Sequence, residues 1–292
     1  MSPRTAALTQ ARTITAEIPR FGRYLSPVVM IRDLYAFRYL IRQFTWREVA
    51  GRYKGTYLGL VWSLIHPLMT LVVYTFVFGV ILNVRFGSQS GGSQLDFALN
   101  LFCGLIVYNI FSTCVGRAPT LIVGNPNYVK RVVFPLEVLP VAILGSALVD
   151  GAIGFAVLMV MLVASSVQIP WTIVLFPLCV APLCALSLGV AWFLAALGVF
   201  LRDVGQAVTV GLQLLFFLSP VVYPLSSVPE SLQLIVRLNP LTTILEGARR
   251  SVMLGLAPEW LWWSAVVVVS LAGLQLGYAW FMRSKRGFAD VV

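Results

Sequence analysis

The chain has 292 residues, of which 59% are hydrophobic and only 11% are charged, and its net charge is +10. A soluble domain of this size needs more charged side chains on its surface, so these proportions exclude an ordinary soluble protein and favour one that lies in a membrane. The positive charge does not indicate a nucleic-acid partner, because ten of the 21 basic residues precede the first apolar segment and no nucleic-acid recognition module accompanies them.

Two segments come before the first long apolar run. Residues 1–30 are polar and contain three prolines, which predicts a loosely ordered cytoplasmic tail without the apolar centre of a cleavable signal. Residues 31–56 follow a helical pattern, in which Leu40 lies off the apolar stripe and Glu48 interrupts it. The stripe consists of Leu34, Phe37, Ile41 and Phe44. We expect an amphipathic helix on the cytoplasmic face of the membrane, and a merely solvated basic helix is the alternative.

Six apolar stretches follow, each long enough to cross a hydrocarbon core of about 30 Å. The expected spans are residues 57–82, 97–118, 136–163, 171–200, 205–222 and 260–282. Seventeen basic residues fall on the side of the N-terminus and four on the other side, which predicts that both termini are cytoplasmic. The sequence therefore predicts an all-α integral membrane protein, with a six-helix transmembrane domain over 57–282 and a short cytoplasmic tail at 283–292.

The segment before the last span, residues 223–258, is less apolar than the spans. Asn239 followed by Pro240 places a capping residue before a first-turn proline, which predicts a corner between two short helices. The first of these helices is expected to start at Ser226 or Ser227. We expect the pair to dip into the outer leaflet as a re-entrant external hairpin, and an ordinary external loop is the alternative.

Chemistry-bearing motifs are few. The sequence has no GxxxxGK[ST] phosphate loop, no HExxH and no GxSxG, so the chain is not expected to hydrolyse ATP by itself. Asp150 is the main acidic residue within a span, and it either serves transport or braces a pair of helices. Gly273 and Gly277 form a GxxxG pair that could pack against another helix. Four cysteines in apolar spans are expected to be buried packing residues and not metal ligands: Cys103, Cys114, Cys179 and Cys184.

A resemblance to a known family rests on two parts of the chain. The run Arg-Glu-Val-Ala-Gly-Arg-Tyr-Lys-Gly-Thr-Tyr-Leu-Gly-Leu-Val-Trp at 47–62, followed by Pro67, resembles the start of the first span in permeases of ABC-type polysaccharide exporters. The run Asn-Pro-Leu at 239–241, with Glu246 and Arg249 before the last span, also fits that family. The resemblance extends from about residue 30 to 285 and implies the ABC-2 type permease fold.

Function and partners are implied by this resemblance. Such permeases form homodimers, bind two copies of a separate ATPase that holds ATP and Mg²⁺, and export lipid-linked polysaccharide across the bacterial inner membrane. The chain looks most similar to O-antigen exporters, and it needs no cofactor of its own. Capsule or teichoic-acid export, and drug or lipid transport by an ABC-2 permease, are alternatives. An alternative from a different class is a membrane glycosyl- or acyltransferase. His66 would be a poor catalytic residue for such an enzyme, because no acidic residue lies near it in the sequence.

Three sets of candidate functional residues follow. The substrate path, expected between two copies and along the first and fifth spans, is assigned to Trp62, Tyr74, Phe217 and Tyr223, although lipid or helix packing is an equal alternative for each ring. Contact with the ATPase is assigned to Arg52, Lys54, Asn125, Tyr128, Lys130 and Arg131, whose alternative role is to hold anionic lipid. The external hairpin residues are Asn239, Pro240, Glu246 and Arg249.

Overall fold

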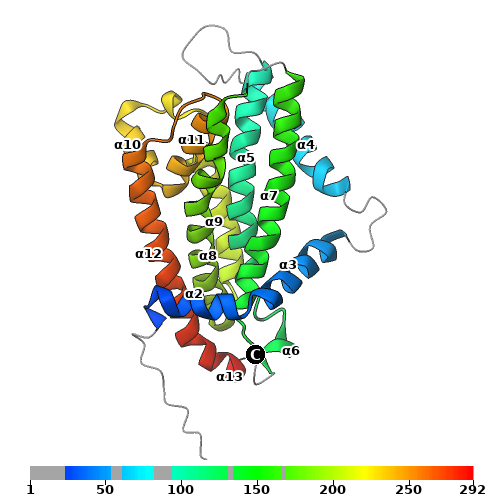
Figure 1. Cartoon of the computed structure of the whole chain (residues 1–292), viewed down its shortest axis with the longest axis vertical. Helices are drawn as coiled ribbons and strands as arrows, with labels where there is room; N and C mark the ends of the chain where they lie inside the picture. The colour runs from blue at the N-terminus through cyan, green and yellow to red at the C-terminus, as the bar shows by residue number, and fades with distance from the viewer. Residues whose placement is uncertain (1–23, 54–60, 82–93, 131–133, 166–168, 292) are drawn as a thin grey trace, which may run out of the picture.

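The computed structural model describes residues 24–53, 61–81, 94–130, 134–165 and 169–291. Within these ranges every regular element is a helix, so the predicted all-α class is confirmed for the part described. Figure 1 shows a bundle of upright helices with shorter helices at both ends. The first and last helices of the described chain, α2 and α13, lie at the same end, whereas α10 and α11 lie at the opposite end (Figure 1).

Four helices in the described ranges are long and apolar enough to cross a membrane. They are α5 (Gln94–Arg117), α7 (Val138–Ala164), α8 (Phe176–Phe200) with the preceding 3-10 turn Trp171–Leu175, and α12 (Trp260–Ser284). With four such helices, the chain is a multi-pass membrane protein. Each coincides with an expected span.

The expected first and fifth spans are shorter helices in the structure. The first comprises α4 (Trp62–Tyr74) and the π-helical turns Thr75–Ile81, and the second is α9 (Val204–Leu218). Pro67 lies inside α4 and cannot donate a backbone hydrogen bond to the preceding turn, so the helix is weakened close to its start. Residues 57–60 of the expected first span lie outside the described residues.

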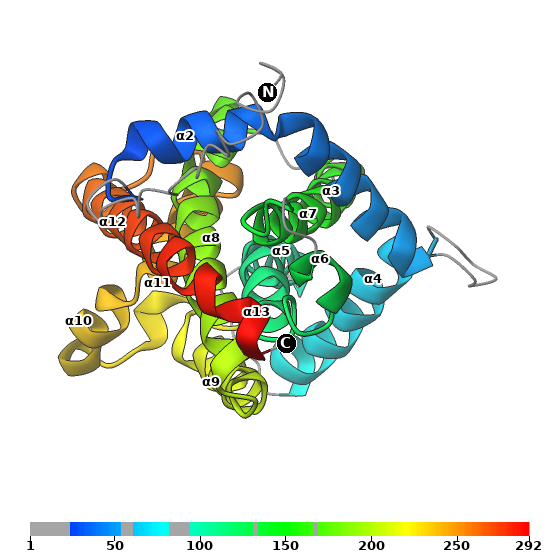
Figure 2. The same cartoon turned by 90° about the horizontal axis from the view of Figure 1, so that it is seen from below.

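Helix α5 is the centre of the bundle, with fifteen of its 24 residues buried. It packs against α7, α8, α9 and α11, and Figure 2 shows it enclosed by the other helices when the molecule is seen from below. The predicted packing of the cysteines holds for three of the four, because Cys103, Cys114 and Cys179 are buried free thiols. Cys184 is only partly buried.

Helices α8 and α12 approach each other so closely that glycine is required at the contact. A Cβ atom at Gly277 would lie 2.1 Å from the backbone oxygen of Gly189, whereas a Cβ atom at Gly273 would meet nothing within 4 Å. The GxxxG pair is therefore part of a packing face, as the sequence pattern suggested, but its two glycines are not equivalent.

The N-terminal region consists of two helices where one interfacial helix was expected. Helix α2 (Pro27–Ala36) begins inside the expected tail, because Pro27 occupies a first-turn position that suits proline. Helix α3 (Arg38–Tyr53) follows after Phe37. Figure 2 shows both helices running around the outside of the bundle. Helix α2 is held against α12 by hydrogen bonds from the Tyr278 hydroxyl to Asp33 (3.0 Å) and from the Gln275 amide to the Tyr24 carbonyl (2.7 Å).

The inward face of α3 is wider than the predicted stripe. Leu40 packs against the core, so the expectation that it lies off the stripe is wrong. Glu48 is also on this face, where it meets a cation instead of apolar atoms. Positions 40, 44 and 48 of α3 fall on one side of a helix with 3.6 residues per turn, which explains why all three face the bundle.

The segment expected to form a hairpin comprises α10 (Glu230–Leu238) and α11 (Pro240–Val252). The predicted Asn-Pro corner is confirmed, because the Asn239 side chain accepts a hydrogen bond from the Leu241 amide at 3.0 Å and donates one to the Ser219 hydroxyl at 2.8 Å. The predicted start of the first helix is wrong. Ser226 and Ser227 belong to a 3-10 turn, and α10 begins only after Pro229.

Candidate functional site

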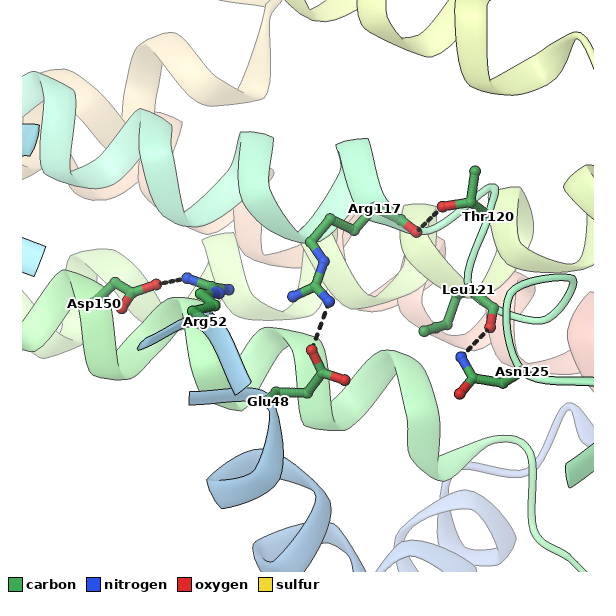
Figure 3. Close-up of polar contacts among 7 residues, drawn as sticks. All are labelled: Glu48, Arg52, Arg117, Thr120, Leu121, Asn125 and Asp150. Atoms are coloured by element: carbon green, nitrogen blue, oxygen red, sulfur yellow. Dashed lines mark hydrogen bonds and ion pairs between the residues drawn. The ribbon is translucent and has the colours of Figure 1, made fainter. Parts of the chain in front are cut away.

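Three side chains of α3 bind three different parts of the bundle. Arg47 donates a hydrogen bond to the Tyr128 hydroxyl, and Glu48 accepts one from Arg117 of α5 at 2.5 Å. Arg52, in the last turn of α3, forms an ion pair with Asp150 of α7. Figure 3 shows the Glu48 and Arg52 contacts side by side. Because three elements are held at once, α3 cannot move without moving α5, α7 and the segment that carries Tyr128.

The Arg52–Asp150 pair changes the interpretation of both residues. Asp150 lies within a span, and its partner is the basic residue at the end of the interfacial helix. Both side chains are about one third exposed, at 28% and 30%. This geometry favours the bracing role for Asp150. It also places Arg52 against α7, which does not favour the predicted contact with a separate ATPase. The sequence contained one signal for this pair, since an acidic residue in a span needs a partner.

The segment after α5 is packed onto α3 by aromatic rings. Tyr128, in α6 (Pro126–Val129), stacks on Phe134 with ring centres 4.6 Å apart and meets the edge of Phe44 at 5.5 Å. The Asn125 amide donates to the Leu121 carbonyl at 2.9 Å and so closes the preceding turn. Lys130 is exposed beside this cluster. The remaining ATPase candidates, Lys54 and Arg131, lie outside the described residues.

The four residues assigned to the substrate path lie in two places. Trp62 lines a cavity of about 340 Å³ together with Arg52 and Asp150. Tyr74 instead meets Phe216 of α9, with ring centres 5.8 Å apart. Phe217, the next residue along, is 60% exposed, and its carbonyl accepts a hydrogen bond from the Tyr223 hydroxyl at 2.9 Å.

One aromatic residue that is not among the predicted site residues joins α4 and α9. Phe216 contacts both Tyr74 of α4 and Tyr108 of α5, with the Tyr108 ring centre 5.1 Å away, and the Tyr108 hydroxyl donates to the Leu212 carbonyl of α9. Helices α4 and α9 therefore converge on the same side of α5. Phe216 could not be distinguished from Phe217 in the sequence, because the pattern alone does not fix which ring faces inward.

Arg249 of α11 is buried and acts as a clamp that links three parts of the chain. Its side chain is 3% exposed, and its guanidinium donates to the carbonyls of Asn100 (3.1 Å), Pro220 and Val221. Glu246, one turn away, pairs with it at 3.2 Å. Burial lowers the pKa of Arg249, and the Glu246 carboxylate opposes this shift.

The clamp ties α11 to the start of α5 and to the segment that follows α9. Gly104 leaves the room that it needs, because a Cβ atom there would lie 2.5 Å from a guanidinium nitrogen of Arg249. The guanidinium fork can satisfy several carbonyls at once, which a lysine ammonium cannot do in the same geometry. Arg249 was predicted as a hairpin residue, and the structure gives it this structural role.

Comparison with known proteins places this architecture in a class. The chain matches the ABC-2 type transporter family over residues 39–253 and belongs to that family. This confirms the resemblance found in the sequence and makes the chain a transporter permease.

The names of individual relatives are more specific than the family description. The O-antigen export system permease protein RfbA of Myxococcus xanthus is 28% identical over 265 residues, which cover 90% of this chain and 99% of the relative. A protein of the same name from Klebsiella pneumoniae is 25% identical over 256 residues, covering 84% of this chain and 92% of the relative. The polysialic acid transport protein KpsM of Escherichia coli is 24% identical over 243 residues, 82% of this chain and 91% of the relative.

Proposed function

We propose that the chain is the membrane subunit of an ATP-driven exporter that moves lipid-linked polysaccharide of the O-antigen type across the bacterial inner membrane. The observation that carries this proposal is similarity to O-antigen export permeases along nearly the whole length of both proteins. Capsule export is the second candidate, favoured by the similarity to a polysialic acid transport protein.

The exporter needs an energy source outside this chain. Members of the family work with a separate ATP-binding subunit, and we propose that two such subunits, which hold ATP and Mg²⁺, bind a dimer of this chain. We place the contact between the two copies on α4, with its extension, and on α9, whose exposed apolar side chains include Met69, Val72 and Phe76 on the first and Val210, Leu214 and Phe217 on the second. A path between two copies provides the room for a hydrated polymer that one small bundle lacks.

Six spans with both termini in the cytoplasm remain our proposed topology. The helix from Trp62 to Ile81 has 20 residues. Seven of them are in π-helical turns, which rise less per residue than an α-helix, so its length is slightly under about 30 Å and close to the thickness of a bilayer core. The location of α2 and α13 at one end of the bundle supports placing both termini on one side (Figure 1). Basic residues are concentrated in the segments at that end, which supports a cytoplasmic location.

Single cysteines in a cysteine-free background test this topology. Lys130→Cys and Glu230→Cys both alter exposed positions at opposite ends of the bundle. In intact spheroplasts, a membrane-impermeant maleimide is expected to label Glu230→Cys and to spare Lys130→Cys until the membrane is opened. Ser88, in the loop between the first two expected spans, would also be external in this topology, but it is not among the described residues. Equal labelling of both variants before opening would contradict the topology.

We further propose that the exposed surface around Tyr128 and Lys130 receives the ATPase, because this cluster is joined through α3 to α5 and α7. A rigid connection of this kind is what transmits motion from a motor subunit to the spans. Lys130→Glu is expected to leave ATP hydrolysis by the complex but to lower export at least about tenfold, which corresponds to about 1.4 kcal/mol of coupling.

Arg202→Glu is the matched control for Lys130→Glu. Arg202 is an exposed basic residue in the turn between α8 and α9, at the same end of the bundle. If these basic residues only hold anionic lipid, both charge reversals should impair export to a similar degree. Export and ATP hydrolysis are measured together, and equal behaviour of the two variants would rule out a specific role for the Lys130 surface.

Deletion of the gene tests the proposed function in cells. The deletion strain is expected to lose surface polysaccharide and to accumulate lipid-linked polysaccharide in the cytoplasm, because synthesis continues while export stops. The chemical nature of the accumulated polymer separates O-antigen from capsule. Normal surface polysaccharide in the deletion strain would show that the proposed function is wrong.

A further inference from the structure

A cavity of about 480 Å³ opens at the end of the bundle that carries α10 and α11. Its walls come from α10, α11, the first turn of α12, the 3-10 turn before α10 and Asn100 of α5. Its volume is in the range of small-molecule sites, about 300–1000 Å³. It shares no lining residue with the cavity beside Trp62 at the start of α4. None of the aromatic residues assigned above to the substrate path lines it.

This external cavity is lined by charged, polar and aromatic side chains, several of which hold one another in place. Glu259 forms ion pairs with Arg237 at 3.2 Å and with Arg250 at 2.9 Å, and all three side chains are between 30% and 40% exposed. The Arg237 guanidinium also lies over the ring of Trp262, 5.8 Å from its centre. Planar charged groups are thus held in fixed orientations beside an indole ring, with room left for a ligand to approach them.

One polar group at the cavity has no partner among the described residues. Thr242 lines the cavity and is 1% exposed, and its hydroxyl makes no hydrogen bond to any described residue. A buried hydroxyl without a partner costs free energy, so its presence calls for a reason. Gln233 and Thr243 add further uncharged donors and acceptors to the lining.

We propose that this cavity binds one sugar unit of the exported chain on the outer side of the membrane; this inference rests on the proposed function. A pyranose ring has an apolar face, which suits the Trp262 indole, and a rim of hydroxyls, which suits the planar Arg237, Glu259 and Gln233 side chains. The cavity carries both carboxylates and guanidinium groups, so it is not built for an anion alone. Each contact is weak enough to release the polymer as it slides.

Binding is tested on the purified chain in complex with its ATPase, in lipid nanodiscs. The probe is the water-soluble polysaccharide released from the surface of the same strain by mild acid, and its binding is followed by saturation-transfer NMR titration. Trp262→Ala is expected to weaken binding about tenfold, the loss of one aromatic face. Trp262→Phe keeps an aromatic ring and should retain most of the affinity, which separates lost stacking from misfolding.

Two further variants sharpen the test. Trp260 is 54% exposed on the same helix and does not line the cavity, so Trp260→Ala should bind like the unmodified chain. Thr242→Val removes the unpartnered hydroxyl at nearly constant shape, so it should weaken binding about threefold without lowering the thermal stability of the protein. Equal binding by Trp262→Ala and Trp260→Ala would overturn the proposal.

Two results would overturn the sugar site in other ways. The first is full displacement of the polysaccharide by inorganic phosphate at the same molar concentration of sugar units, which would mark an anion site. The second is the absence of any binding to the unmodified complex. If either occurs while the deletion strain still loses its surface polysaccharide, only the external sugar site is wrong. If the deletion strain keeps its surface polysaccharide, the proposed function fails instead.

Discussion

Gly277→Ala is expected to separate α8 from α12 and to destabilise the protein by about 3 kcal/mol or more, the upper range for overpacking a close contact. The added Cβ atom would lie 2.1 Å from the backbone oxygen of Gly189, and a backbone atom inside a helix cannot move aside as a flexible side chain can. The measurement is the fraction of monodisperse protein that survives heating in detergent, followed by size-exclusion chromatography.

Gly273→Ala is the control for this substitution. It changes the other glycine of the same pair, but its Cβ atom would meet nothing within 4 Å. Alanine is also the better helix former, so this variant should be neutral or more stable by up to about 1 kcal/mol. If both variants lose stability equally, the close contact of α8 with α12 at Gly277 is contradicted.

Arg249→Leu is expected to remove the clamp of the external hairpin and to cost about 3–5 kcal/mol, the range for breaking a buried charged pair. The change leaves the carbonyls of Asn100, Pro220 and Val221 without the guanidinium and leaves Glu246 without its cation. Arg249→Lys keeps the charge but loses the fork, and it should be intermediate. Protein yield and heat resistance in detergent measure the effect.

Arg250→Leu is the matched control, because Arg250 is the next residue on α11 and its side chain is 30% exposed. Its ion pair with Glu259 is partly in water, so its loss should change stability by about 1 kcal/mol or less. A chain that tolerates Arg249→Leu as well as Arg250→Leu would show that the hairpin is held in another way.

Local sequence patterns correctly predicted those features of the fold that depend only on residues close together in the chain. Asn239 and Pro240 specify a corner through a side-chain cap and a fixed backbone angle, and the structure has that corner. The lengths of the apolar stretches likewise predicted where the helices of the bundle lie. Four of the described helices are long enough to span a membrane by themselves. Pro229 delays the start of α10, which shows how one residue shifts a boundary that the serines before it seemed to mark.

Contacts between distant residues account for what the sequence did not predict. Arg52 and Asp150 are 98 residues apart, and Arg249 binds the Asn100 carbonyl across 149 residues. Neither pairing produces a periodic pattern in the sequence from which it could be predicted. Gly273 and Gly277 likewise look equivalent in the sequence, and only the position of α8 makes one of them indispensable. The same reason explains why the sequence did not show that Arg52, at the end of α3, pairs with Asp150 of α7.

The most direct test of the proposed function is transport into inside-out membrane vesicles, in which the outer face of the exporter points to the lumen. Vesicles that contain this chain, its ATPase and lipid-linked polysaccharide are expected to move the polymer into the lumen when ATP is added, where it resists an added polysaccharide-degrading enzyme. Vesicles without the chain, or with the chain but no ATPase, should leave it accessible. Equal protection in vesicles that lack the chain would contradict its role as the exporter's membrane subunit.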